Sequence, residues 1–450
     1  MKVYYAIILL FISINSSAQN KPLISGPWAG NVQIKTATIW AEVNSTVKKV
    51  AVQYYLTNNA AVKKTIAYKG ELGKDFNPVK IELTGLEMNS KYNYQLIIDD
   101  KVITTAFPTT FTTQELWQFR KPEPDFSFLA GSCFYVNEPS VDRPGKPYGE
   151  DSSIFETMAK TPGAFHIWMG DNWYAREVDF GSPWGLNYRA SRDRSQSVIQ
   201  KFMASMPQYS IWDDHDYGPN DAGKSYIFKD ESRNIFKNYS VNPSYGEDGK
   251  GIYTQFAFSD VDVFLTDDRY FRSHDEMKDT LDALGNPTKQ FLGGQQLEWL
   301  KNSLLFSKAT FKIVVVGSQV LNPLNAYECM RNYEYEYKEL MRFLDDSKVP
   351  GVVFFTGDRH HSEVIKLDRP GIYPLYDVTA SSYTAGVSKA SGKEADNPFR
   401  VNNTLVEENN FARISVSGAA RKRVLKVEFI NKEGVVRGSC EIEGADLRAK

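Results

Sequence analysis

The feature that most constrains the fold is the alternation of short apolar strands with helical stretches, which begins at Asp125. We expect strands at 126–130, 164–169, 261–265, 311–316 and 352–356. We expect helices between them at 152–160, 188–206, 295–305 and 333–344. Such alternation is typical of an α/β domain built from layers. The tail at 411–443 returns to a β pattern, with a turn expected at 431–434.

Residues 20–110 follow a different pattern, in which short β-rich runs are separated by Gly, Asn and Lys. The runs lie at 32–34, 38–43, 50–55, 79–83 and 92–97. Short strands at this spacing are typical of an all-β sandwich. The Thr-Gly-Leu turn at 84–86, which precedes a Lys-Tyr-Asn-Tyr strand, resembles a fibronectin type III module. Residues 111–124 are expected to link this module to an α/β domain at 125–450.

Residues 1–18 have the pattern of a Sec-type secretory signal peptide. Lys2 precedes an apolar run at 3–14, and small residues up to Ala18 supply a cleavage site. The run is shorter than the roughly 20 residues that span a bilayer, so a cleaved signal is favoured over an uncleaved anchor or a buried strand. We therefore expect a secreted or periplasmic protein without a later transmembrane segment.

The composition excludes several classes of protein. Lys and Arg number 53 against 55 Asp and Glu, which argues against a broadly basic surface for nucleic acid. Aromatic residues make up 13% of the chain, which argues against a disordered acidic protein. Three cysteines are too few for a disulfide scaffold; Cys329 and Cys440 could pair or could be buried free thiols. With only five histidines, a large metal site must use other ligand types.

Polar motifs directly follow the expected strands, where the ligand sites of α/β folds lie. Gly-Ser-Cys at 131–133 lets the backbone turn and places the Cys133 thiol at a strand end. Gly-Asp-Asn-Trp-Tyr at 170–174 offers Asp171, which can bridge two cations, and Tyr174, which can bind a hard cation such as Fe³⁺ as phenolate. Alone, each motif is also compatible with a packed cysteine or a turn aspartate.

Two further motifs are denser in candidate ligands. The segment 211–216 reads Ile-Trp-Asp-Asp-His-Asp, and clustered carboxylates repel one another unless cations neutralise them. Its apolar start argues against a solvated acidic loop. The segment 356–362 reads Thr-Gly-Asp-Arg-His-His-Ser, in which Asp358 and His360 point to the same side of an extended chain. Both motifs favour metal ligation.

Two weaker features complete the set of strand-end motifs. Arg269, which follows the strand at 261–265, could bind a phosphate, and Gln319, which follows 311–316, could hydrogen-bond a group in the site. Each could equally form a surface ion pair or a turn contact. Taken together, the motifs predict a polynuclear metal site. Such a site suits hydrolysis of phosphate esters, because metals polarise the phosphoryl group and generate hydroxide.

In this order, the motifs Gly-Ser-Cys, Gly-Asp-x-x-Tyr, Trp-Asp-Asp-His-Asp and Gly-Asp-x-His-x-Ser resemble the PhoD-like alkaline phosphatases. These are a branch of the calcineurin-like metallophosphoesterases, related to purple acid phosphatases. The resemblance implies a four-layer α/β sandwich of two β-sheets flanked by helices, preceded by the small β module. It also implies Fe³⁺ and Ca²⁺ as cofactors, with phosphomonoesters and phosphodiesters as small-molecule substrates. The shortage of histidine and wealth of carboxylate separately favour Ca²⁺ over Zn²⁺.

The resemblance further implies roles for individual residues. The residues expected to surround iron are Cys133, Asp171, Tyr174 and His360. The residues expected to bind calcium are Asp171, Asp214 and Asp358. The catalytic pair would be His215, as proton donor to the leaving group, with Asp214, and the phosphate ligands would be Asn220 and Arg269.

The chain departs from the family pattern at some points. It lacks a twin-Arg signal, Asn220 is matched only by offset, and His361 has no assigned role. The metal ligands do not separate a general phosphatase from a phospholipase-type or nucleotide-directed phosphodiesterase. The pocket walls, expected at 173–187 and 273–287, would decide that question. A third alternative is a surface binding protein with a degenerate enzyme domain. We expect a monomer.

Overall fold

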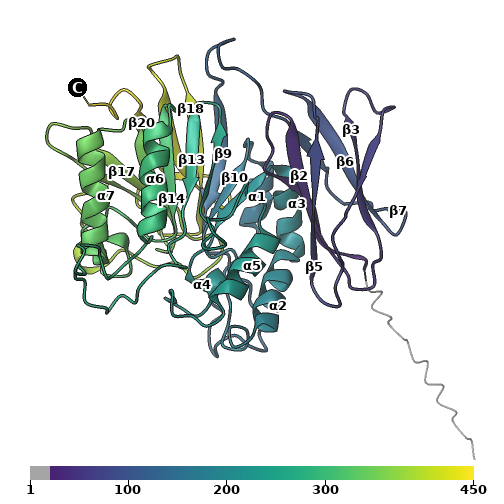
Figure 1. Ribbon diagram of the computed structural model, residues 1–450, viewed down its shortest axis with the longest axis horizontal. Coiled ribbons are helices and arrows are strands. Elements are labelled where there is room, and N and C mark those ends of the chain that lie inside the picture. Colours follow the sequence, from purple (N-terminus) through teal and green to yellow (C-terminus); the bar gives the residue numbers. More distant parts are fainter. Residues whose placement is uncertain (1–20, 450) are drawn as a thin grey trace, which may run out of the picture.

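The computed structural model describes residues 21–449, and the predicted signal peptide at 1–18 lies outside this range. Two six-stranded sheets form its larger part (Figure 1). The strands of the first sheet are, in spatial order, β11 (Gln208–Ile211), β10 (His166–Met169), β9 (Phe126–Gly131), β18 (Asn410–Ser417), β19 (Val424–Asn431) and β20 (Val436–Glu443). The strands of the second are β12 (Thr254–Phe258), β13 (Val261–Leu265), β14 (Phe311–Val316), β15 (Val352–Thr356), β17 (Leu375–Thr379) and β16 (Glu363–Leu367).

Helices cover the outer faces of the paired sheets. The α-helices are α1 (Ile154–Lys160), α2 (Pro183–Arg194), α3 (Ser197–Ser205), α4 (Asp214–Tyr217), α5 (Lys229–Tyr239), α6 (Gly294–Phe306) and α7 (Glu334–Ser347). Helices α6 and α7 lie at one side of the paired sheets, and α1 and α3 lie near β10 at the other side (Figure 1). Between the sheets, Phe128 of β9 stacks on Phe355 of β15 with ring centroids 6.1 Å apart. The predicted four-layer α/β sandwich is confirmed.

The strand directions place the predicted site at one edge of the structure. Strands β9, β10 and β11 are mutually parallel, as are β13, β14 and β15. The carboxyl ends of parallel strands lie at a common edge of their sheet, where α/β folds bind ligands. The strand-end motifs of each sheet therefore emerge together.

An all-β module precedes these sheets, as predicted. It contains β1 (Leu23–Gly30), β2 (Thr36–Val43), β3 (Val50–Leu56), β4 (Lys64–Ala67), β5 (Asn77–Thr84), β6 (Lys91–Ile98), β7 (Lys101–Val102) and β8 (Thr110–Thr112). One sheet has the order β1-β2-β5, and the other has the order β4-β3-β6-β7, with β8 also paired to β6. Likeness to fibronectin type III stays a prediction. So do the domain boundaries, although β8 takes up the first two residues of the expected linker 111–124.

Two expectations about secondary structure were wrong, and two helices were not expected. Residues 32–34 connect β1 to β2 instead of forming a strand, and the first strand spans the less β-like Ser-Gly-Pro sequence before them. The single helix expected at 188–206 is two helices that break at Ser195 and Gln196. The first of these begins earlier, where Pro183 follows a Ser182 cap that accepts from the Gly185 N–H at 3.0 Å. Helices α4 and α5 were not expected.

Two other features settle open questions from the sequence. Cys329 and Cys440 are free thiols, so the alternative of a disulfide between them is not realised. Within residues 21–449, no helix is both long and apolar enough to cross a membrane.

Two tryptophans of the β module belong to the core of the larger unit. Trp28 of β1 and Trp40 of β2 stack with centroids 3.9 Å apart, and both are buried in the same cluster as the sheets described above. The Trp40 indole N–H also donates to the Asn238 carbonyl at 2.6 Å. The module is therefore anchored by apolar packing as well as by the chain connection.

We predict that Trp40→Ala lowers the free energy of unfolding by about 3–5 kcal/mol, the usual effect of removing a buried tryptophan. The loss should appear in urea denaturation followed by circular dichroism. As a control on the same module, Tyr55→Ala removes a half-buried ring and should cost about 1 kcal/mol. Equal midpoints for the two variants would contradict an anchoring role for Trp40.

Candidate metal centre

A cavity of about 570 Å³ opens at the shared carboxyl edge of the strands. The loops after β10, β11 and β15 supply its most reactive side chains. The predicted site residues that line it are Asp171, Asp214, His215, Asn220, Asp358 and His360. Residues that are up to 189 positions apart in the sequence therefore face one space.

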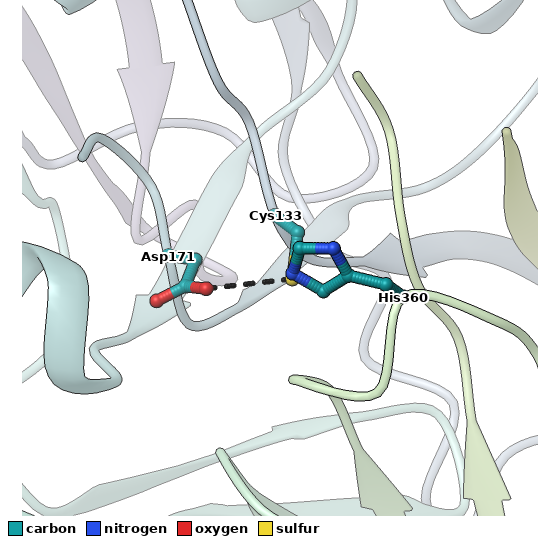
Figure 2. Close-up of side chains that lie close together, drawn as sticks. All are labelled: Cys133, Asp171 and His360. Carbon is teal, nitrogen blue, oxygen red and sulfur yellow. Dashed lines mark hydrogen bonds between the residues drawn. The ribbon is translucent and has the colours of Figure 1, made fainter. Parts of the chain in front are cut away.

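The four residues expected around iron form one cluster. The Cys133 thiol lies 3.4 Å from Oδ2 of Asp171, and Cys133, Asp171 and His360 converge in Figure 2. The Tyr174 hydroxyl donates to the same Oδ2 at 2.8 Å and lies 3.3 Å from Nε2 of His360. One ligand atom each from Cys133, Asp171 and His360 lie within 4.8 Å of one another. This spacing suits a single cation.

A second cluster shares Asp171 with the first. Ligand atoms of Asp171, Asp214 and His215 also lie within 4.8 Å of one another. Oδ1 of Asp171 faces this side, where the His215 backbone N–H lies 3.4 Å away. Asp171 thus presents one oxygen to each cluster, which suits a carboxylate that bridges two cations through both oxygens. Asp358 lines the same cavity but lies outside these close groups.

The backbone is strained at the candidate ligands. Cys133, Asp171, Asp358 and His360 have φ values of 65°, 53°, 65° and 57°, in the left-handed region that side chains disfavour. Such strain is typical of functional sites, where surrounding contacts hold it in place. Gly170 also has a positive φ of 96°, and a Cβ atom there would lie 2.6 Å from that of Asp213. Only glycine lets the β10 loop approach the β11 loop so closely.

Hydrogen bonds orient the His360 ring. Its Nδ1 lies 2.6 Å from the Gly386 carbonyl, so the ring donates through Nδ1. The Nε2 lone pair is then free to face the cluster with Cys133 and Asp171. Fixing the tautomer through the second nitrogen is the usual arrangement for a metal-binding histidine.

Burial makes the clustered acids electrostatically unfavourable without a cation. Burial, together with the charges of Cys133 and Asp214, raises the pKa of Asp171 well above its usual range. Burial and the neighbouring Glu328 and Asp214 raise the pKa of Asp358 to about 7. A bound cation would favour the ionised forms. The phenolate and carboxylate oxygens fit a hard trivalent ion such as Fe³⁺, imidazole and the softer thiolate also bind iron, and the carboxylate-rich side fits Ca²⁺.

Arg269 is not on the open wall of the cavity. Its side chain is fully buried, its Nε donates to Oδ1 of Asp213 at 2.6 Å, and its guanidinium pairs with Glu328. Asp213, Asp214 and Glu328 form a third acidic group, which this arginine partly neutralises. Its nearest approach to Asp214 is 4.0 Å. The predicted role of Arg269 in phosphate binding stays a prediction.

Several residues near the site were not assigned from the sequence. Asp213 lies inside a recognised motif, but adjacent aspartates do not reveal which one faces an arginine. Glu328 and Tyr148 come from loops without a motif, and nothing in the sequence locates them. Gln319 donates to Glu363 and Thr379, both at 2.9 Å, and supports the buried interior.

His361, which had no assigned role, is also buried. Its Nε2 lies 3.8 Å from Glu363, too far for a hydrogen bond. We find no partner within hydrogen-bond distance of either ring nitrogen among the described residues.

The architecture and this edge site define a class of protein. The chain shares the fold of a solved structure described as PhoD, with a TM-score of 0.72 and 17% identity over 94% of this chain and 90% of that one. It also shares the fold of the purple acid phosphatase PPD1 from yellow lupin (Lupinus luteus) seeds. There the TM-score is 0.65 and the identity 11%, over 93% of this chain and 74% of that one.

Sequence comparison identifies the family within this class. Residues 145–424 match the PhoD-like phosphatase family, and the chain belongs to that family. The resemblance inferred from the motifs is confirmed. Alkaline phosphatase D of Bacillus subtilis (strain 168) is 23% identical over 202 residues, which are 39% of this chain. The aligned segment spans only 34% of that relative's length.

We predict that added Fe³⁺ and Ca²⁺ raise the melting temperature of the metal-free protein, and that the rise grows as pH increases through about 7. Asp358, whose raised pKa is about 7, holds a proton below that pH and must lose it to bind a cation. Differential scanning fluorimetry between pH 6 and 8 measures the shift.

Asp171→Asn should remove most of this metal-dependent shift. It should not destabilise the metal-free protein, because it deletes a buried acid that lacks a cationic partner. Asp446→Asn, at an exposed acid near the C-terminus, is the matched control and should respond as the wild type does. A full metal response in Asp171→Asn would contradict the bridging assignment.

Proposed function

We propose that the protein is an exported, metal-dependent phosphoric ester hydrolase that cleaves phosphomonoesters or phosphodiesters. The observation that carries the proposal is the bridging position of Asp171, with one oxygen toward Cys133 and Tyr174 and the other toward the His215 side. Family membership and the shared fold support the reaction class. The signal-like pattern at 1–18 supports export.

We assign Fe³⁺ to the cluster of Cys133, Asp171, Tyr174 and His360. We assign Ca²⁺ to the side of Asp171 that faces Asp214, with Asp358 as a further ligand from the same cavity. Bound cations of this kind polarise a phosphoryl group and lower the pKa of water. Thiolate and phenolate favour the iron position, and carboxylates favour the calcium position.

His215 is proposed as the proton donor to the leaving group. Its side chain is about a quarter exposed at the cavity, and its Nε2 lies 3.8 Å from Oδ2 of Asp214. The ring stacks on Tyr174 at 4.1 Å, which fixes its plane. In hydrolysis, a water molecule releases a proton to solvent and its oxygen bonds to phosphorus, the ester P–O bond breaks, and the leaving oxygen takes the proton that His215 carries. Burial lowers the pKa of His215, and the negative charge of Asp214 opposes this shift in favour of the charged ring.

The remaining predicted residues act on the substrate phosphate in this proposal. Asn220 lines the cavity beside His215 and can donate its amide to a phosphate oxygen. Arg269 contributes positive charge from behind the wall, where it pairs with Asp213. This positive charge reduces the negative electrostatic potential of the cavity, which would otherwise repel an anionic ester.

We expect purified protein to contain iron and calcium and to absorb visible light through charge transfer from tyrosinate or thiolate to Fe³⁺. Elemental analysis, a visible spectrum and hydrolysis of bis(p-nitrophenyl) phosphate and p-nitrophenyl phosphate test this. Tyr174→Phe should shift or abolish the band, because it removes the phenolate. Tyr209→Phe, at a buried tyrosine that packs on Phe256, should leave it unchanged. Colourless, active protein with zinc alone would overturn the iron assignment.

His215→Gln should lower kcat by about 10²–10⁴ for esters of simple alcohols, the usual effect of losing a general acid. The loss should be much smaller for p-nitrophenyl esters, whose leaving group needs little protonation. His274→Gln makes the same change at an exposed histidine and should leave both rates unchanged. An equal loss for both kinds of ester would rule out proton donation to the leaving group.

A further inference from the structure

A second cavity, of about 470 Å³, adjoins the metal centre. Tyr148, His215 and Asn220 line both cavities. The second cavity therefore begins at the proposed proton donor, shares Tyr174 with the metal centre, and otherwise extends away from the candidate metal ligands. A leaving group protonated by His215 would lie on this side, so we name this space the leaving-group cavity.

The walls of the leaving-group cavity are rich in aromatic rings. Tyr135 packs against Tyr148 with centroids 4.8 Å apart at 73°, and against Tyr174 with centroids 5.1 Å apart. Phe180 and Pro144 add apolar surface. These ring edges and faces favour the binding of a planar aromatic ring. Aromatic pairs in tilted or offset contact gain free energy beyond that from burying surface area.

Charged groups in the same wall argue against a lipid chain. Arg176 pairs with Asp142 at 3.3 Å, and its guanidinium lies 3.8 Å from the centre of the Tyr135 ring. An acyl chain would cover this pair and offer it no hydrogen bond, which is unfavourable for a buried ion pair. A heteroaromatic ring can stack on the tyrosines and still present polar edge atoms.

The charged residues at the mouth of the cavity also favour an aromatic group. Arg143 and Lys146 are highly exposed there, but each is paired with a glutamate, Glu177 and Glu150 respectively. These pairs leave little net charge to recruit a second strongly anionic group. The aromatic wall is then the feature that distinguishes one ester from another.

We infer that the leaving-group cavity binds a planar aromatic ring carried by the alcohol part of the phosphate ester, either a nucleoside base or the ring of a benzyl-type alcohol. The inference rests on the proposed function, because the metal centre must hold the phosphate for the ring to reach this cavity. His215 then lies between phosphate and ring, next to the oxygen that departs. The substrate class is phosphate esters whose alcohol part carries an aromatic ring.

Matched substrate pairs test this inference with the full metal-loaded protein. Adenosine 5′-monophosphate is compared with ribose 5-phosphate, and benzyl phosphate with cyclohexylmethyl phosphate, each also as its methyl diester. Within a pair the leaving group is a primary alkoxide of similar basicity, so intrinsic reactivity is nearly the same. We expect kcat/KM to favour the aromatic member by about tenfold, equivalent to one or two good aromatic contacts. Preference in only one pair identifies the source of the ring.

Variants at Tyr135 connect the preference to the cavity. Tyr135→Leu should reduce the ratio of kcat/KM within a pair to near one, whereas Tyr135→Phe, which keeps the ring, should preserve it. A ratio is insensitive to the fraction of active protein, so partial misfolding does not obscure it. Tyr335→Leu, at an exposed tyrosine of α7, is the matched control.

Two outcomes separate this inference from the proposed function. Equal kcat/KM within both pairs overturns the aromatic cavity, while the hydrolysis itself upholds the phosphoesterase. If no ester is cleaved after metal loading, the proposed function fails, and calorimetric titration with adenosine and benzyl alcohol decides the cavity alone. Binding that Tyr135→Leu abolishes supports the inference, and absence of binding to the wild type overturns it.

Discussion

Repulsion among buried acids is the constraint on which the rest of this structure depends. Asp171, Asp213 and Asp214 are buried at one edge of two sheets, with the buried Glu328 and the half-buried Asp358 beside them. An uncompensated buried charge is strongly unfavourable. Arg269 compensates the acids on one side through Asp213 and Glu328. The other side, around Asp171, lacks a cationic side chain among the closely grouped residues, and this is where the thiol, phenol and imidazole gather.

The two-sheet architecture lets the chain concentrate these groups. Parallel strands end at a common edge, and the loops after β10, β14 and β15 begin with a glycine that lets each approach its neighbour. A Cβ atom on Gly357 would lie only 2.5 Å from the Met169 carbonyl oxygen. The β15 loop therefore meets the β10 loop across the sheets. The left-handed backbone at Cys133 and Asp171 follows from the same crowding. Hydrogen bonds between loops hold these residues, because the Phe134 N–H donates to the Asp171 carbonyl at 3.0 Å and the Thr384 N–H donates to the Cys133 carbonyl at 3.2 Å.

Much of the fold and the cluster around Asp171 could be predicted from the sequence, because each buried strand is an apolar run that is followed at once by polar residues. The break at Ser195 was missed because helical residues continue on both sides of it. The strand at Leu23–Gly30 was missed because its Ser-Gly-Pro stretch reads as a turn. Tyr148 and Glu328 could not be located, since tertiary folding alone brings those loops to the cavity.

The segment 213–216 illustrates why a cluster of charges must be divided residue by residue. Asp213 faces the arginine, and Asp214 is the only one of the three carboxylates that lines the cavity. Asp216 accepts from the backbone N–H groups of Asp213 at 2.6 Å and Asn172 at 3.1 Å, so it ties the β11 loop to the β10 loop. Burial raises the pKa of Asp216 to about 7, although these hydrogen bonds oppose the shift. Asp213 and Asp216 therefore stabilise the surrounding loops, and Asp214 is left, with Asp171, to face a cation.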